Sequence, residues 1–349
     1  MRILITISLI FCCLFTYSQD EQFSQYYSAS LYLNPGFNGI YDDAAVHMNH
    51  KRRLNSGSIA TREVINELTQ VSFIFPIKPR SKTERPIGGI GLMAFNHKEG
   101  FRGIYDRSSV FLNYSHNLTF GSLGGYLVSI GGQVGYDIRR FDITGLRWPS
   151  QYNPFFGNDE TLPIPVAEFN AQKQNIVVNG GIMYYFNPDR NYFLYKYSGF
   201  VGISATNLNR PNTSFTINDQ GTDPVLLKYN GGIEFKINKL FITPSLLFLY
   251  LSRNYQYNAG INMSWAPDAG RYTGSDKQLL FGTWYRFRDS FIFMGGVRIN
   301  QLAIRASYDM NSDLFIPNRD IIARNSVELS IQYYLTNSRA VKRFSNPLF

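Results

Sequence analysis

Histidine and acidic side chains are the residues of this sequence whose chemistry could support metal binding or catalysis. The chain has four histidines, His47, His50, His97 and His116. His47 and His50 lie three positions apart, so on a β-strand their side chains would point to opposite faces and could not share a metal ion. The histidines therefore do not predict a metal site.

Two short motifs resemble ligand-binding loops only in part. Residues 309–313 (DMNSD) alternate oxygen-bearing side chains as a calcium loop does, but Leu314 stands where that loop requires glycine. Residues 88–91 (GGIG) are rich in glycine, but no helix pattern follows them, so they do not form a dinucleotide-binding turn. The serine–glycine elbow of hydrolases is also missing. We therefore predict no cofactor, no bound metal and no enzymatic activity.

Residues 1–18 (MRILITISLIFCCLFTYS) have the layout of a secretory signal peptide, with one basic residue, an apolar run and then small and polar residues. We expect cleavage after Ser18, which leaves Gln19 as the first residue. Cys12 and Cys13 leave a lipoprotein signal as the alternative, although the residues before them are bulky rather than small. Both cysteines lie in the part removed, so we expect a mature chain without thiols or disulfides.

The composition is unusual for a soluble domain. Aromatic residues make up 16% of the chain, and charged residues make up only 17%. Soluble domains are usually about 25% charged. The longest apolar run, residues 240–251, is too short for a membrane-spanning helix and contains Pro244. The net charge of +9 is scattered along an exported chain, so it fits anionic lipid headgroups or an acidic partner rather than nucleic acid.

Hydrophobic and polar residues alternate over most of the mature chain, a period of two that is typical of β-strands with two different faces. In residues 326–335, Val327 and Leu329 share one face. Glu328 and Ser330 share the other. The candidate strands are residues 45–54, 68–76, 87–96, 108–118, 124–140, 174–186, 197–206, 226–237, 239–251, 256–264, 278–287, 290–299, 301–309 and 324–335.

Alternation alone fits either a soluble sandwich or a membrane barrel, because an apolar face packs on a second sheet in one and on lipid in the other. The candidate strands are longer than the roughly 5–6 residues of soluble strands. They match the roughly 9–11 residues with which a tilted strand crosses a bilayer. The sequence therefore predicts an all-β fold, a transmembrane antiparallel β-barrel of about 14 strands in the outer membrane.

The connections between the candidate strands differ in length at the two ends of this barrel. With both termini in the periplasm, the odd-numbered connections would be extracellular, and together they are much the longer set, as in outer-membrane barrels. The longest connection is residues 141–173. Its aromatic residues predict an ordered cover or a partner-binding surface, with Trp148, Tyr152, Phe155 and Phe156 as the candidate contact residues.

The segment before the first strand is rich in aromatic residues and has no charged residue from Gln25 to Tyr41. An Asn-Pro-Gly turn at residues 34–36 would let it double back. We expect residues 19–44 to be periplasmic and to plug or cap the lumen, to dock a periplasmic partner, or to pack against the base of the barrel. The candidate residues are Tyr26, Tyr27, Asn34, Pro35 and Phe37. The barrel would follow at 45–335, and a basic tail at 336–349.

Several motifs occur in a recognisable order along the mature chain. They are QDEQFSQY at 19–26, LYLNPGFNG at 31–39, VGISATNL at 201–208, WYR at 284–286, ASYD at 306–309 and SVELS at 326–330. In this order they resemble the PorP/SprF family of outer-membrane proteins linked to the type IX secretion system of Bacteroidetes. The chain departs from the family pattern at Gly36, where alanine is usual, and at Val327, where histidine is frequent.

The resemblance implies a non-enzymatic outer-membrane barrel that works with secretion and gliding machinery. Its partners would be secreted cargo, held through the cargo's C-terminal domain, or periplasmic components of the secretion machinery, together with outer-membrane lipid. Two other hypotheses remain. A porin-like or hydrophobic-compound transport barrel would use lumen charges such as Lys228, Glu234, Lys236 and Arg305. An exported soluble β-sandwich adhesin is the third.

Overall fold

The computed structural model describes residues 22–41, 43–54, 64–79, 86–120, 125–142, 149–153, 155, 157–158, 171–187, 197–216, 221–252, 254–267, 277–311 and 325–335. The predicted signal peptide and the predicted basic tail lie outside these residues. No helix in the described part of the chain is long and apolar enough to cross a membrane.

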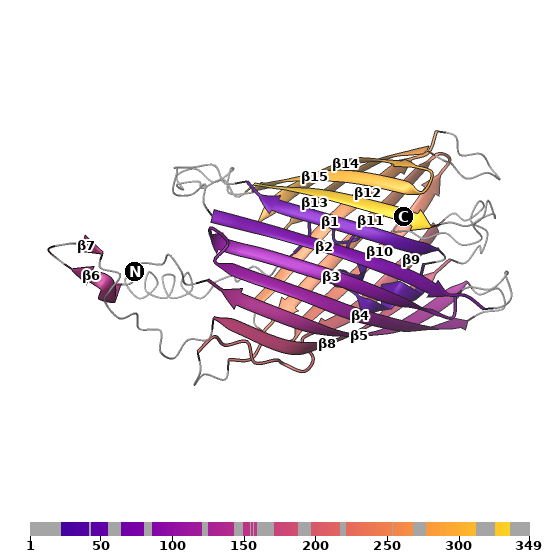
Figure 1. Cartoon of the computed structure of the whole chain (residues 1–349). Helices are drawn as coiled ribbons and strands as arrows, with labels where there is room; N and C mark the ends of the chain where they lie inside the picture. The colour runs from indigo at the N-terminus through magenta and orange to yellow at the C-terminus, as the bar shows by residue number, and fades with distance from the viewer. Residues whose placement is uncertain are drawn as a thin grey trace, which may run out of the picture.

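Fourteen antiparallel strands of the described residues close into one barrel (Figure 1). They are β1 (Ala44–Arg53), β2 (Val64–Ile77), β3 (Gly88–Phe101), β4 (Tyr105–Phe120), β5 (Tyr126–Phe141), β8 (Gln172–Phe186), β9 (Tyr197–Thr206), β10 (Leu226–Ile237), β11 (Leu240–Leu251), β12 (Asn254–Trp265), β13 (Lys277–Arg286), β14 (Ser290–Ile299), β15 (Leu302–Asn311) and β16 (Ser326–Leu335). Each strand pairs with its neighbours along the chain, and β1 pairs with β16 to close the wall. The predicted fold class is confirmed.

Five short elements of the described residues lie outside the wall of the barrel. A single turn of helix, α2 (Ser30–Leu33), and a 3-10 helix, η1 (Pro35–Gly39), precede β1. A 3-10 turn, η2 (Pro149–Gln151), and the two-residue strands β6 (Tyr152–Asn153) and β7 (Gly157–Asn158) belong to the long connection between β5 and β8. This connection lies at the end of the barrel where β1 ends, whereas the opposite end is where β1 begins and β16 stops (Figure 1).

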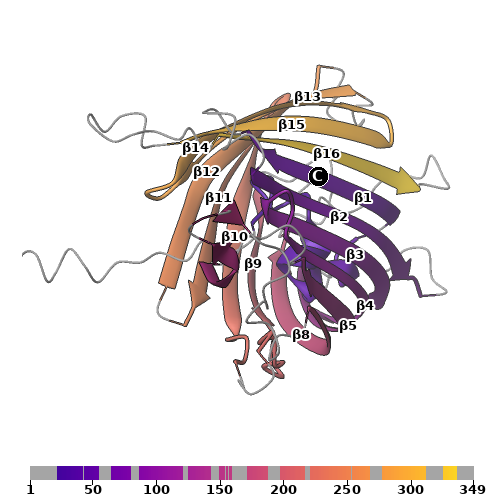
Figure 2. The same cartoon turned by 60° about the vertical axis from the view of Figure 1, so that its left-hand side comes forward.

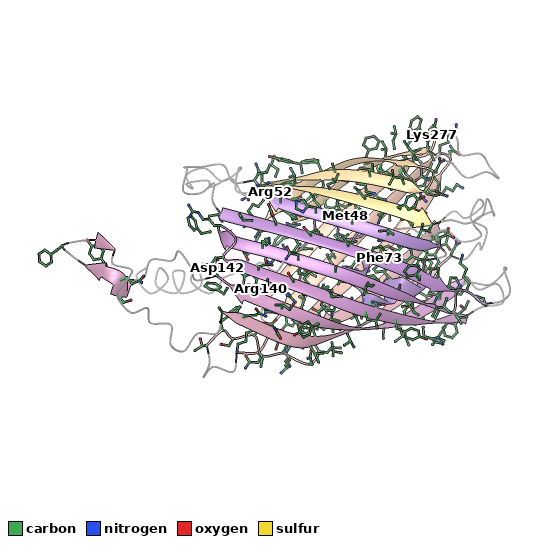
Figure 3. The ribbon with its side chains drawn as sticks, viewed as in Figure 1. Met48, Arg52, Phe73, Arg140, Asp142 and Lys277 are labelled. Carbon is green, nitrogen blue, oxygen red and sulfur yellow. The ribbon has the colours of Figure 1, made fainter. Side chains whose placement is uncertain are left out.

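The alternation seen in the sequence becomes an apolar outer face and a polar inner face. Met48 and Phe73 point outward from β1 and β2, and both are exposed on the outside of the barrel (Figure 3). Ser330 and Glu328 on β16 point inward and are buried, while Leu329 between them is exposed. An apolar belt on the outside of the barrel is the surface that contact with lipid requires. Closure of the barrel also leaves no strand edge unpaired in the membrane.

Several strands are longer than the sequence pattern predicts. β3 continues to Phe101, and β4 runs from Tyr105 to Phe120, where residues 87–96 and 108–118 were expected. The extra residues near these ends, such as Lys98, Glu99 and Asp106, are polar and do not alternate with apolar ones. Alternation therefore marks only the part of each strand that has a lipid-facing side, and the ends beyond it escape prediction.

Candidate functional site

Residues 22–41 lie inside the barrel and cross its lumen before the chain enters β1. We call these residues the luminal segment. Figure 2 shows its indigo trace enclosed by the wall of strands. Phe23 and Phe37 are completely buried, and Tyr26 and Tyr27 nearly so. The segment bonds to β15 and β16 near its start and to β8 and β9 in its middle, so it spans the lumen from one side of the wall to the other.

Asn34 both starts η1 and ties it to the barrel wall. Its Oδ1 accepts a hydrogen bond of 2.8 Å from the backbone N–H of Gly36 and so caps the N-terminus of the 3-10 helix. Pro35, the first residue of this helix, has no N–H that needs a partner. Its Nδ2 donates to the backbone oxygens of Ile182 and Ile203, at 3.2 and 3.1 Å. One amide group therefore satisfies the turn and fixes it to β8 and β9.

Aromatic rings of the luminal segment pack on rings and hydroxyls of the wall. Tyr27 stacks on Trp284 with ring centroids 5.3 Å apart, and Phe37 meets Phe200 edge to face at 6.1 Å. The Tyr26 hydroxyl shares a hydrogen bond of 2.9 Å with the Ser245 hydroxyl. Burial raises the pKa of Tyr26 to about 12, so its phenol is neutral at physiological pH and acts as an ordinary hydrogen-bonding group.

The first residues of the luminal segment bind a cluster of charged side chains, which we call the Ser24 network: Ser24, Lys51, Arg286, Asp309 and Glu328. The backbone N–H of Ser24 donates to Glu328 Oε2 at 2.6 Å, and its hydroxyl donates to Asp309 Oδ2 at 2.5 Å. Lys51 Nζ lies 3.0 Å from the same Asp309 oxygen, and Arg286 Nη1 lies 3.5 Å from it. Two carboxylates and two cations from four strands thus converge on one serine of the segment.

Backbone oxygens further along the segment bind polar side chains from the opposite side of the barrel. Lys228 Nζ donates to the Tyr32 oxygen at 2.8 Å and lies 4.2 Å from the centre of the Tyr32 ring. The Ser204 hydroxyl donates to the Leu33 oxygen at 2.7 Å. Lumen-facing Lys228 was expected to suit polar solutes, but its ammonium holds the chain's own backbone.

Gly131 of β5 lets the luminal segment approach the wall. A Cβ at this position would lie 2.4 Å from the carbonyl carbon of Pro35 and 2.5 Å from the nitrogen of Gly36, whereas a Cβ at the outward-facing Gly132 would meet nothing within 4 Å. Contacts this short with backbone force the segment to shift, because backbone cannot rotate away as a side chain can.

We therefore expect Gly131→Ala to lower the free energy of unfolding by roughly 1–3 kcal/mol through overpacking. Gly132→Ala is the matched control, since both substitutions lower the conformational entropy of the unfolded chain by the same amount. Urea unfolding of the purified barrel in detergent measures both. Equal stability of the two variants would contradict the close packing of η1 on β5.

A second group of charges holds the connection between β9 and β10 at the end of the barrel where β1 ends. Arg139 of β5 donates two hydrogen bonds to Asp223 of this connection, at 3.3 and 2.5 Å, and also pairs with Asp137 at 2.7 Å. The ring of Phe215 packs on the ring of Phe141, with the two centroids 5.8 Å apart. The connection therefore crosses β8 and is held against β5.

The structure separates the residues that the sequence singled out into two groups. Tyr26, Tyr27, Asn34, Pro35 and Phe37 lie together in the lumen and are buried. Tyr152 and Phe155, in the connection between β5 and β8, have exposed fractions of 64% and 90%. Trp148 and Phe156 lie outside the described residues. The two groups are on different parts of the molecule, so they do not form one site.

Sequence reasoning missed the charged residues that receive the luminal segment. Lys51 was not singled out from the sequence, and Glu328 was noted only as part of an alternating strand. Asp309 was weighed as the first residue of a calcium-like loop, yet it faces the lumen and pairs with Lys51. The sequence feature that could have identified Lys51, Asp309 and Glu328 was their place on the polar face of a strand, because a charged side chain must be paired if the lumen excludes water.

Comparison with known proteins identifies the family. The family described as type IX secretion system membrane protein PorP/SprF matches residues 15–333. None of the curated proteins compared with the chain matches it.

Solved barrels resemble the chain at low identity. A FadL homologue of Pseudomonas aeruginosa is 10% identical, with 87% of this chain and 93% of that chain covered and a TM-score of 0.46. The CymD monoaromatic hydrocarbon channel is 8% identical, with 88% and 92% covered and a TM-score of 0.49. The KdgM porin is 7% identical, with 83% and 99% covered and a TM-score of 0.35.

The family match covers most of the chain, and the closed wall of antiparallel strands with an apolar outer face is that of an outer-membrane barrel. This protein is a β-barrel of the outer membrane, and it belongs to the PorP/SprF family of type IX secretion system membrane proteins.

Proposed function

We propose that this protein serves type IX secretion as a closed barrel that anchors or helps to export secreted surface proteins, and that it is not a diffusion channel. The observation that carries the proposal is the luminal segment. Its residues are buried and occupy the space that a solute would need, and its hydrogen bonds attach it to opposite sides of the wall. The family and the barrel fold both point to a non-enzymatic membrane protein.

In this proposal the buried aromatic residues of the luminal segment hold it in place and do not contact a partner. Tyr27 packs on Trp284 and Phe37 packs on Phe200, and both rings are buried, so little of either ring is left for another protein. In this proposal, partners bind at the ends of the barrel. We assign the end where β1 ends to the cell exterior, since barrels of this class carry their longer connections there.

Exposed aromatic residues in the connection between β5 and β8 are the proposed contact with cargo. Tyr152 in β6 and Phe155 between β6 and β7 present large apolar areas, and aromatic side chains of this kind contribute much of the affinity at protein interfaces. The partner class is the C-terminal domain of a secreted surface protein, as the family suggests.

We expect the double variant Tyr152→Ala, Phe155→Ala to lower recovery of cargo by about tenfold or more when the tagged protein is purified gently from native outer membranes, because each lost anchor contributes about 1–2 kcal/mol. Mass spectrometry of the co-purified proteins is the measurement. Phe287→Ala is the matched control, because Phe287 is an exposed aromatic residue in another connection at the same end.

Three results distinguish the possibilities. A large secreted protein recovered with wild type and the control but not with the double variant supports the anchoring role. Periplasmic ring or motor components, recovered equally with all three, would replace that role with one inside the secretion machinery. Recovery of no partner from membranes that contain the cargo would contradict both.

A further inference from the structure

Two arginines on neighbouring strands point into the lumen near the end of the barrel where β1 begins. Arg298 is the penultimate residue of β14, and Arg305 lies on β15. Arg298 stands opposite Ala303, so Arg305 is two positions further on the same face and a diagonal neighbour of Arg298. Both side chains are buried, with exposed fractions of 9% and 5%.

The guanidinium groups of this pair meet rings and one amide oxygen. Arg305 Nη1 donates to Gln332 Oε1 at 2.5 Å, and the Tyr334 hydroxyl donates to the same oxygen at 3.3 Å. Arg298 lies over the Tyr334 ring, 5.0 Å from its centre. Arg305 lies 5.9 Å from the centre of the Tyr27 ring. Gln332 and the rings therefore hold the two cations side by side.

The pair has no carboxylate partner in the described part of the chain. Arg298 makes no hydrogen bond or ion pair with any described residue, and Arg305 makes one hydrogen bond, to a neutral amide. Each guanidinium has five N–H donors, so most of their donors are available. Two neighbouring cations also repel each other.

The lumen acids on nearby strands are engaged elsewhere. Asp309 and Glu328 belong to the Ser24 network, and Asp289 pairs with Arg286 at 2.9 Å. Buried cations without a counter-charge carry a large desolvation cost. Such a pair is therefore unfavourable for the barrel by itself, in contrast to the compensated charges of the Ser24 network.

We propose that Arg298 and Arg305 form a binding site for an oxyanion, a carboxylate or a phosphate, that enters the lumen from the end where β1 begins. The planar N–H fork of arginine matches the paired oxygens of these anions. Both side chains point inward, so lipid headgroups on the outer face cannot reach them, and the ligand is a soluble anion. The site goes beyond the proposed anchoring function and does not depend on it.

The test uses the full mature chain purified in detergent, with inorganic phosphate and acetate as separate probes and sodium chloride at matched ionic strength as the reference. We expect phosphate or acetate to raise the unfolding temperature of wild type with a saturable dependence, and isothermal titration to give a dissociation constant. In Arg298→Gln that affinity falls roughly tenfold or more, as expected for the loss of a bidentate charged contact. The probe that binds more tightly identifies the ligand class.

Two further variants keep the result interpretable. Arg140→Gln removes an exposed arginine from β5, so it should bind the probes as wild type does. Without any probe, Arg298→Gln should unfold at a higher temperature than wild type, because it removes an uncompensated buried charge. Stabilisation by phosphate and acetate that equals that by chloride, or that survives in Arg298→Gln, would overturn the proposal.

Discussion

Deleting residues 22–40 is expected to convert a non-conducting barrel into one that conducts ions. A fourteen-stranded barrel approaches the size at which porins leave an aqueous channel, and here the luminal segment takes that space. Once the segment is gone, the inward-facing polar residues of the wall would line a water-filled path, since they are the residues that now bind the segment. Conductance in planar lipid bilayers measures the difference directly.

The deletion variant must first be shown to form a barrel, which heat-modified mobility on a gel reports. Ser28→Cys offers an independent measurement that leaves the segment in place, because Ser28 is completely buried and the mature chain is expected to contain no other thiol. A maleimide reagent should not label it, but should label Tyr152→Cys, whose side chain is exposed. Wild-type conductance equal to that of the deletion variant would remove the basis for a closed barrel.

Asp309→Asn is expected to destabilise the barrel by about 3–5 kcal/mol, the usual cost of leaving buried charges without their partner. Asp309 Oδ2 lies 3.0 Å from Lys51 Nζ and also accepts the Ser24 hydroxyl, and its side chain has an exposed fraction of only 3%. The neutral amide keeps the size of the side chain but cannot compensate the two nearby cations. Urea unfolding in detergent micelles is the measurement.

Asp43→Asn is the matched control for this prediction. Asp43 pairs with Lys78 at 3.5 Å, but Lys78 has an exposed fraction of 57%, so this surface pair contributes at most about 1 kcal/mol. Adding Lys51→Met to Asp309→Asn should restore part of the lost stability, because it removes one of the uncompensated cations. If Asp309→Asn costs no more than Asp43→Asn, the Ser24 network does not hold the luminal segment.

The wall of the barrel could be predicted from the sequence because its information is local. Each strand needs one face for lipid and one for the lumen, and a period of two is the direct consequence in residues such as 326–335. The predicted strands therefore coincide with the observed ones, and the errors lie at ends such as Phe101, where polar residues lose the alternation. The family resemblance follows from motifs spread over these same strands and from the segment before them.

The position of the luminal segment is decided by contacts between residues far apart in the chain. An uncharged aromatic run before β1 predicts burial, but it does not tell whether the run caps the base of the barrel, docks a partner or enters the lumen. Ser24 bonds to Asp309 and Glu328, which lie on the last two strands, and Lys51 of the first strand joins them only when β1 pairs with β16.

The same reason separates what the sequence by itself determined from what needed the tertiary structure. Alternation determined the strands and their two faces, and strand length together with alternation predicted the membrane-barrel fold, because each is read from neighbouring residues. Closure of the wall decided which lumen charges of the described residues compensate one another, as Lys51 and Asp309 do, and which have no counter-charge among those residues, as at Arg298 and Arg305. Charge compensation depends on distances across the lumen, and these are set only when the barrel has closed around its own N-terminal residues.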